Sequence, residues 1–319
     1  MRKLLIIALL IVGCDNSTEP LPEDCAGVSG GIAVEDCAGV CNGSAVVDCV
    51  LGCKAIPQNV ELWGECYNIE ETTELDLHRN HLSGEIPSEI GNLTNLTYLS
   101  LHGNELKGGI PPEIWELTNL THLYLHSNQL NGEIPPDIGS LTNLTVLTLS
   151  LNQLTGEIPS SIGNLTNLIA LALDSNYLSG GIPSEIEYLT NLTGLNLDSN
   201  YLSGEIPSSI GNLTNLERLE LYFNQLSGAI PPEIENLTNL IHLHLDSNSL
   251  SGEIPSEIGS LTNLEFLGLS DNYLTAIPES FCDIKSYLLD GYSFSGNKIC
   301  GELPSCLTAE EIGEQDCGY

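Results

Sequence analysis

A 24-residue pattern recurs along most of this 319-residue chain. The copies begin at Thr72 and then at leucines spaced by 24 residues, with a last step of 25: Leu96, Leu120, Leu144, Leu168, Leu192, Leu216, Leu240, Leu264 and Leu289. A unit this short buries too little apolar surface to fold alone, so the copies must stack and share a core. The period therefore predicts a solenoid, in place of the two ordinary domains that the length alone would allow.

Each position within a copy has a physical role. Leu99 and Leu101 alternate with polar residues, which predicts a short strand whose leucines point inward. Asn104 follows the strand, where its amide can bond to the turning backbone. Pro111 and Pro112 fit the start of a short helical or 3-10 turn. Such asparagines recur in every copy and should form a ladder: Asn80, Asn104, Asn128, Asn152, Asn176, Asn200, Asn224, Asn248, Asn272 and Asn297.

The consensus of these copies resembles the plant-type leucine-rich repeat, LxxLxLxxNxLSGxIPxxIGxLxx. Segments 82–87 and 250–255, both LSGEIP, carry the match, which covers ten copies in residues 72–304. The resemblance implies an α/β solenoid, a right-handed horseshoe with a parallel β-sheet on its concave face and short 3-10 or helical turns on its convex side. The ninth copy departs from the pattern, because residues 274–278 (LTAIP) lack one residue and the glycine. We expect a disturbed stack there.

Segments on both sides of the repeats resemble the caps of this family. Residues 63–66 (WGEC) are similar to the end of the amino-terminal cap, to which we assign residues 54–71. Residues 297–306 are similar to the carboxy-terminal cap, in which two cysteines pair, and residues 305–319 form its tail. The resemblance implies a disulfide between Cys300 and Cys306, which leaves Cys282 to pair with Cys317.

The first residues have the features of an export signal. Arg2 and Lys3 precede an apolar run, residues 4–12, that is too short to span a bilayer. The run ends in IVGC, which resembles the lipobox of bacterial lipoprotein signals and implies cleavage before Cys14 and acylation of its thiol. We expect a signal peptide at 1–13, a tether at 14–23, and an exported protein lipid-anchored at the bacterial cell envelope, on its periplasmic or cell-surface side. An ordinary secretory signal with a chance cysteine is the alternative.

Eleven cysteines indicate an oxidising compartment, and removing Cys14 leaves ten, an even number. Residues 24–53, rich in Cys and Asp, predict a disulfide-stapled spacer. The five cysteines of this spacer are Cys25, Cys37, Cys41, Cys49 and Cys53. Together with Cys66 they make six thiols, which allow fifteen disulfide connectivities. A zinc–thiolate site is less favoured in an exported chain. Asp24, Asp36 and Asp48 could hold calcium, but their spacing is not that of an EF-hand loop.

The charge and the motifs exclude several functions. With 43 acidic and 8 basic residues, the chain has a net charge of −35, which does not suit nucleic acid. An anionic membrane surface would repel it, so we expect membrane contact through the lipid anchor at Cys14 alone. GxGxxG, Walker A and HExxH motifs are missing from the sequence, and the repeats, caps and spacer leave no stretch for a catalytic domain. We therefore expect no enzyme and no cofactor.

The copies differ most at the exposed positions of the strands, and these positions indicate where a ligand would bind. Copies four to six carry small side chains there, such as Ala170, Ala172 and Gly194. On one side of this low floor lie Tyr98, His102, His122, Tyr124 and His126. On the other side lie Arg218, Glu220, Tyr222, His242 and His244. Tyr and His offer flat, polar-tipped surfaces, so we expect a cradle for a protein or glycan ligand. The alternative is that copies four to six have merely diverged least.

Two functions follow from this pattern. The first is a non-catalytic cell-surface module that binds a protein or glycan through the concave face. The alternative is an inhibitor or regulator of a secreted polysaccharide-degrading enzyme, by analogy of fold alone. Two groups of histidines on this face could suggest a metal site: His78, His102 and His126, and His242 and His244. No carboxylate partners for these histidines are evident, so we expect no bound metal. The identity of the ligand and the oligomeric state stay open at this point.

Overall fold

The computed structural model describes residues 58–318. The chain divides into two compact units, Met1–Asn68 and Ile69–Tyr319. The described part of the first is an antiparallel hairpin of β1 (Asn59–Leu62) and β2 (Glu65–Asn68), and Cys66 on β2 is disulfide-bonded. Outside the described residues lie the signal peptide, the tether, the spacer and the predicted lipidation site, with Cys14, Cys25, Cys37, Cys41, Cys49 and Cys53.

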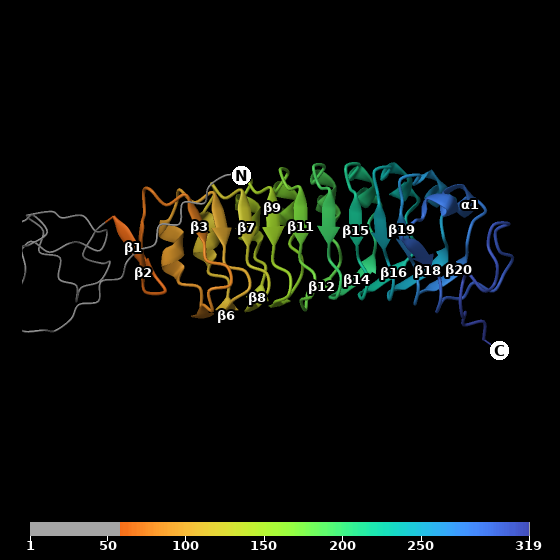
Figure 1. The fold of residues 1–319 in the computed structure, drawn as a ribbon, viewed down its shortest axis with the longest axis horizontal. Coiled ribbons are helices and arrows are strands. Elements are labelled where there is room, and N and C mark those ends of the chain that lie inside the picture. The colour runs from red at the N-terminus through yellow and green to blue at the C-terminus, as the bar shows by residue number, and fades with distance from the viewer. Residues whose placement is uncertain (1–57, 319) are drawn as a thin grey trace, which may run out of the picture. The chain divides into compact units, whose positions relative to one another are not determined.

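One parallel sheet of ten short strands runs through the second unit (Figure 1). Each repeat contributes one strand, which pairs with the strands of the neighbouring repeats, so the copies stack in sequence order. In nine of the ten strands the middle residue is a buried leucine, as the alternating pattern predicts. The strands are β3 (Glu74–Asp76), β5 (Tyr98–Ser100), β7 (His122–Tyr124), β9 (Val146–Thr148), β11 (Ala170–Ala172), β13 (Gly194–Asn196), β15 (Arg218–Glu220), β17 (His242–His244), β19 (Phe266–Gly268) and β21 (Gly291–Ser293).

A second row of strands follows the asparagine of each repeat and forms two parallel sheets (Figure 1). The first holds β4 (Ser83–Gly84), β6 (Glu105–Gly109), β8 (Gln129–Glu133) and β10 (Gln153–Thr155). The second holds β12 (Ser179–Gly180), β14 (Tyr201–Glu205), β16 (Gln225–Gly228), β18 (Ser249–Glu253) and β20 (Tyr273–Ala276). The glycine of the repeat takes a left-handed conformation here, at Gly108 with φ of +83°, and turns the chain toward the far side.

Short 3-10 helices form the side opposite the ten-stranded sheet. Each begins after a proline in extended conformation and buries an isoleucine, as Pro111 and Ile114 do around η3. The helices are η2 (Ser88–Asn92), η3 (Pro112–Glu116), η4 (Pro136–Ser140), η5 (Ser160–Asn164), η6 (Ser184–Tyr188), η7 (Ser208–Asn212), η8 (Pro232–Asn236) and η9 (Ser256–Ser260). The parallel sheet and the 3-10 turns confirm the predicted leucine-rich repeat fold.

The ninth repeat is irregular, as its shortened motif predicts. The pairing of β18 with β20 shifts register between Gly252 and Glu253, so Glu253 faces Ala276. A short α-helix, α1 (Phe281–Ile284), and η10 (Lys285–Tyr287) stand where the other repeats have one 3-10 helix. The missing residue thus disturbs the stack locally.

The predicted asparagine ladder is present from the second repeat onward. Asn104 Oδ1 accepts hydrogen bonds from the backbone N–H groups of Asn80 (2.9 Å) and Leu82 (3.0 Å). Its Nδ2 donates to the carbonyls of Leu77 (2.9 Å) and Leu101 (2.8 Å), which joins two repeats. Each later asparagine of the ladder donates in the same way to its own repeat and to the preceding one. The ladder satisfies backbone groups that the core would otherwise leave unpaired.

The carboxy-terminal disulfides differ from the predicted pairing. Cys282 pairs with Cys306, and Cys300 pairs with Cys317. Lys285 Nζ donates to the Cys306 carbonyl (2.6 Å), which holds this segment against α1 and beside Cys282. The tail then returns along the last repeat, because the N–H of Asp316 donates to the Asn297 carbonyl (2.6 Å), and this contact brings Cys317 to Cys300. The pairing of Cys300 with Cys306 and of Cys282 with Cys317 is therefore wrong.

Candidate functional site

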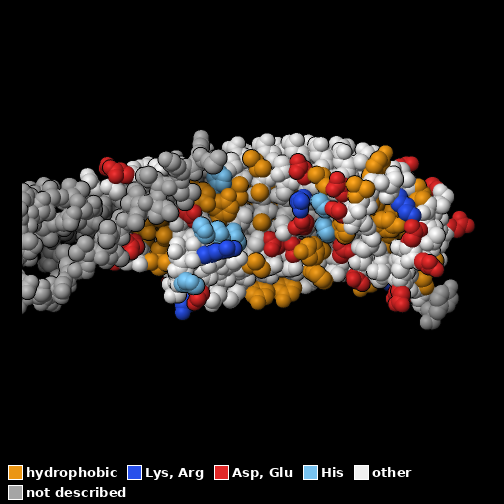
Figure 2. Space-filling view, viewed as in Figure 1, with side chains coloured by type: hydrophobic (Ala, Val, Ile, Leu, Met, Phe, Trp, Pro, Cys, Tyr) orange, Lys and Arg blue, Asp and Glu red, His pale blue; other side chains and the backbone are white. Residues whose placement is uncertain are grey.

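The exposed face of the ten-stranded sheet, here called the concave face, carries all ten predicted site residues. The first and third residues of each strand point outward, and the residue two positions further continues the same row. Parallel pairing in register places equivalent residues of neighbouring copies side by side, as it does Tyr98, His122 and Val146. Two groups result, which Figure 2 shows as two clusters of histidine separated along the solenoid.

The first group, called the aromatic–histidine cluster, is Tyr98, His102, His122, Tyr124 and His126. The Tyr124 ring lies at its centre, with ring centroids 5.5 Å from Tyr98, 6.2 Å from His102, 6.0 Å from His122 and 6.3 Å from His126. Burial, with Tyr98 beside it, raises the pKa of Tyr124. The structure therefore brings these five rings into one continuous surface.

A stack of imidazole rings extends this cluster by one repeat. The His78 and His102 ring centroids lie 4.8 Å apart with an interplanar angle of 1°, and those of His102 and His126 lie 4.3 Å apart at 14°. Each Nδ1 has a partner: Asp76 Oδ1 for His78 (2.6 Å), Ser100 Oγ for His102 (3.0 Å) and Thr148 Oγ1 for His126 (2.8 Å). These contacts fix the three rings parallel to one another.

The second group, called the mixed cluster, is Arg218, Glu220, Tyr222, His242 and His244. The His244 ring centroid lies 5.8 Å from that of Tyr222 and 6.3 Å from that of His242. Burial raises the pKa of Glu220, with Asp198 adding to it and Arg218 opposing it. The structure therefore brings these residues together as well.

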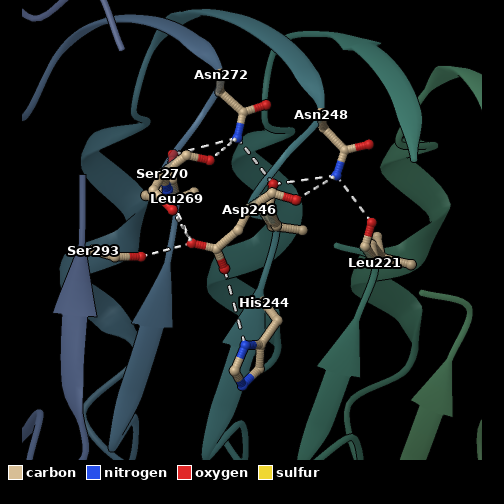
Figure 3. Close-up of polar contacts among 9 residues, drawn as sticks. Leu221, His244, Asp246, Asn248, Leu269, Ser270, Asn272 and Ser293 are labelled. Carbon is tan, nitrogen blue, oxygen red and sulfur yellow. Dashed lines mark hydrogen bonds and ion pairs between the residues drawn. The ribbon is translucent and has the colours of Figure 1, made fainter. Parts of the chain in front are cut away.

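Carboxylates support both histidines of the mixed cluster, although none is evident from the sequence. His242 Nε2 lies 3.3 Å from Asp290 Oδ2, and His244 Nδ1 lies 4.0 Å from Asp246 Oδ2. Asp246 is itself held by Ser270 Oγ (2.7 Å) and Ser293 Oγ (2.6 Å), as Figure 3 shows. The two-residue spacing of His244 and Asp246 places both on one face of the chain, so this pair could have been found in the sequence.

The floor between the clusters carries small side chains on β11 and β13, and it also carries carboxylates. Asp174 accepts a hydrogen bond from Ser150 Oγ, and Asp198 is buried beside Tyr222. Burial raises the pKa of Asp198, and the charge of Asp174 adds to it. Burial and the neighbouring Asp198 raise the pKa of Tyr222 to about 12. Acidic side chains therefore lie between the two groups of histidine (Figure 2).

The histidine columns do not have the geometry of a metal site. Metal ligands converge on one point, whereas the stacked rings of His78, His102 and His126 lie parallel and place their nitrogens in a row. In the part of the chain that the structure describes, no three or more His, Cys, Asp or Glu side chains are grouped to hold a metal ion.

A second, external asparagine ladder, which was not predicted from the sequence, flanks the solenoid where the 3-10 helices end. Asn119 Nδ2 donates to the Thr94 carbonyl (2.9 Å), and Asn143 Nδ2 donates to the Thr118 carbonyl (2.8 Å). The exposed threonines are Thr94, Thr118, Thr142, Thr166, Thr190, Thr214, Thr238 and Thr262. The exposed asparagines are Asn95, Asn119, Asn143, Asn167, Asn191, Asn215, Asn239 and Asn263. The LTN segment of the repeat is the sequence signal for this ladder.

Models of known protein families match the repeats of this chain. The leucine-rich repeat region model matches residues 124–229, and two leucine rich repeat models match residues 70–130, 239–261 and 263–284. No curated protein sequence matches the chain.

Several solved structures are similar to the chain. The plant peptide hormone receptor RGFR1 in complex with RGF2 is 37% identical, with a TM-score of 0.68 over 77% of this chain and 36% of the receptor. The Arabidopsis receptor kinase HAESA, in complex with the peptide hormone IDA and the co-receptor SERK1, is 36% identical, with a TM-score of 0.65 over 73% of this chain and 39% of the receptor. A plant ice-binding protein is 30% identical, with a TM-score of 0.52 over 74% of this chain and 84% of that protein.

These matches indicate both where the protein acts and which family it belongs to. The chain spans well under half the length of the two receptor chains. Its disulfides and its likeness to such receptors indicate an exported protein. Among the described residues, no helix is long and apolar enough to span a bilayer. With family models matched over most of residues 70–284 and a core built from the same repeats, the chain belongs to the leucine-rich repeat proteins.

Proposed function

We propose that this protein is a non-catalytic binding module that holds a protein or peptide ligand on its concave face. The observation that carries the proposal is the arrangement of two clusters of Tyr and His around a floor of small residues such as Ala170 and Ala172. Interfaces draw most of their binding energy from a few Tyr, Trp and Arg side chains, and here Tyr124, Tyr222 and Arg218 stand on either side of the floor.

The comparisons support a ligand of this class. The similar receptors were solved with a peptide hormone, in one case together with a co-receptor. An extended peptide that crosses the strands would pass from one cluster to the other over the floor. Copy two and copy eight are separated by about six strand spacings, or about 29 Å. A peptide of about nine extended residues would span this distance. A glycan could use the same rings by stacking, and this stays a second ligand class for the same face.

The location proposed for this module is the outer side of a bacterial membrane. Cleavage before Cys14 and acylation of its thiol would tether the repeats through residues 15–23, so the ligand would be met outside the cytoplasm. Mass spectrometry of the protein purified from membranes tests the anchor, and an unmodified thiol at residue 14 would contradict it.

The proposal is tested by blocking the floor. The full chain is immobilised, and proteins and peptides from the extracellular fluid of its source are captured and quantified. Ala172 lies half-buried on β11, so Ala172→Trp should fill the floor and reduce capture of a specific ligand at least tenfold. Thr190→Trp, on the exposed external flank, should leave capture unchanged.

The identity of the captured ligand separates the alternatives. A captured polysaccharide-degrading enzyme that loses activity would favour the inhibitor or regulator function. A receptor, peptide or surface glycan would favour the binding module. Equal capture by both tryptophan variants and the unmodified protein would contradict binding on the concave face.

Binding to ice is a second candidate function, because one specific surface favours it. The eight threonines and eight asparagines of the external ladder stand in two exposed columns with a spacing of about 4.8 Å between neighbouring copies. Such a regular array of hydroxyl, methyl and amide groups can order surface water. The plant ice-binding protein that this chain resembles is matched over 84% of its length.

Thermal hysteresis of the purified protein tests this second function. We expect a gap between the melting and freezing temperatures. Thr166→Lys with Thr190→Lys should abolish this gap, and Ala172→Trp should preserve it. Freezing at the melting temperature, with no gap, would contradict it.

A further inference from the structure

We propose that His78, His102, His126 and Arg79 form a pH-dependent site for a carboxylate-rich segment of the protein ligand. This inference rests on the proposed function of the concave face and names one chemical feature of its ligand. The histidine stack supplies a row of ring nitrogens, and Arg79 supplies a fixed positive charge at its edge.

The outer edge of the histidine stack is unoccupied by other described residues. All three Nδ1 atoms are engaged by Asp76, Ser100 or Thr148. The Nε2 atoms of the same rings make no hydrogen bond or ion pair with any residue from 58 to 318. Because the rings are stacked 4.3–4.8 Å apart, their Nε2 atoms form a row that can donate to successive oxygens once the rings are protonated.

Arg79 is held beside this stack by the absence of a side chain at Gly103. A Cβ added to Gly103 would meet Arg79 Cγ at 2.9 Å, so the stem of Arg79 lies directly over that glycine. Most equivalent positions in other repeats carry a side chain in the same left-handed conformation, as Ser127 and Leu151 do with φ of 58° and 55°. The backbone therefore does not require glycine at 103, whereas the path of Arg79 does.

The charge of Arg79 is available to a ligand. Its guanidinium makes no ion pair with another described residue, in a chain with 43 acidic and 8 basic residues. By contrast, Lys285 is paired with Glu311 at 2.6 Å. Guanidinium binds carboxylates in a bidentate geometry, which gives this site its preference for carboxylates.

The groups around the stack make it respond to pH. Burial lowers the pKa of His102 and His126, and the neighbouring imidazoles and Arg79 lower both further. Asp76 opposes this effect at His102, as Asp174 does at His126, and Asp76 also holds His78. The other titratable groups at the cluster are Glu74, Tyr98, His122 and Tyr124. A bound carboxylate favours the protonated rings and raises their pKa. By linkage, affinity for the carboxylate then rises as pH falls through the pKa of the bound state and levels off below that of the free state.

The test measures histidine pKa values by NMR on the full chain at low ionic strength. The probe is a tetraglutamate peptide with blocked ends, and tetraglutamine and inorganic sulfate are the comparisons. Tetraglutamate should raise the pKa of His102 and His126 by about one unit, equal to a tenfold preference for the protonated protein. Tetraglutamine should leave both values unchanged, and sulfate should raise them less, because it cannot span the row.

Two variants isolate the contribution of Arg79. Gly103→Ser adopts the residue most common at this position and displaces the Arg79 side chain, so it should lose most of the tetraglutamate effect, as Arg79→Gln should. His81→Gln, at an exposed histidine outside the stack, should retain the full effect. Unchanged pKa values with tetraglutamate, or equal shifts with tetraglutamine, would overturn the proposal. A captured ligand that binds through Tyr124 and Tyr222 with the same affinity at pH 5.5 and 7.5 would overturn it too, and would leave the proposed function standing.

Discussion

The imidazole of His244 lies nearly parallel to the phenyl ring of Phe266 on the next strand, with ring centroids 4.3 Å apart. A Cβ on Gly268, the residue paired with His244, would collide with Asp246 Oδ2 and would meet Phe266 Cε1 at 2.9 Å. The missing side chain at Gly268 therefore lets Asp246 and Phe266 enclose His244. The mixed cluster is built around this histidine.

Removing the Phe266 ring should change the titration of His244. Burial lowers the pKa of His244, against the opposing charge of Asp246. Phe266→Ala exposes the imidazole, so its pKa should rise toward or above the ordinary value of about 6.5. NMR titration of the His244 ring measures this change. Phe223→Ala, which removes an exposed ring that contacts Tyr222, should shift His244 far less; equal shifts in both variants would refute this role of Phe266.

The internal asparagine ladder should contribute more to the stability of the repeats than the external ladder does. Asn152 Nδ2 donates to the carbonyls of Leu125 and Leu149, both at 3.0 Å, and its Oδ1 accepts from Leu130 N. Asn152→Ala leaves these buried groups unpaired and should lower the free energy of unfolding by about 3 kcal/mol. Asn167→Ala in the external ladder, where water can replace the bond to Thr142, should cost less than about 1 kcal/mol. Urea unfolding followed by circular dichroism compares them, and equal losses would contradict the assignment.

Asp198 should limit stability at neutral pH. Its pKa is raised in the folded state, so ionising it costs folding free energy once the pH exceeds the unfolded pKa, and this penalty is complete above the folded pKa. Asp198→Asn should therefore raise the urea midpoint at pH 7, and the advantage should disappear below about pH 3.5. It should also lower the pKa of Tyr222 from about 12.

The control for Asp198 is an exposed carboxylate. Asp137→Asn, on η4, should leave the urea midpoint unchanged at both pH values. A gain from Asp198→Asn that persists at pH 3 would show that the effect is not one of ionisation.

The carboxy-terminal disulfides give a chemical prediction. Peptide mapping of the oxidised protein should recover Cys282 joined to Cys306 and Cys300 joined to Cys317. The paired change Cys282→Ser with Cys306→Ser should cost about 3–4 kcal/mol, because that bridge closes a loop with a sequence separation of 24. Recovery of Cys300 joined to Cys306 would contradict this pairing.

The sequence predicts the periodic part of this fold because each repeat position has one physical role. Leu99, Asn104 and Ile114 are set by their period alone, and all three behave as expected. Ile110 is half-buried, although the equivalent Ile134 and Ile158 lie in the core. The disulfides depend instead on how one irregular tail folds back. That path is set by single contacts such as Lys285 to Cys306, which no period encodes.

The candidate site divides in the same way. Register places the rings of Tyr98, His122 and Tyr124 together, so the columns of the sequence predict their contact. Asp290 reaches His242 from 48 residues away, in the irregular last repeat, and only the folded chain shows this. The stem of Arg79 over Gly103 depends likewise on side-chain paths rather than on strand pairing.

The affinity of the captured ligand for Tyr124→Ala and Tyr222→Ala tests the central claim most directly. These rings stand on the two sides of the floor, and each substitution should weaken binding about 30-fold, as loss of an interface hot spot does. Tyr188→Ala, at an exposed tyrosine on η6, should bind like the unmodified protein. Binding that is unaffected by the Tyr124 and Tyr222 changes would contradict recognition through the concave face.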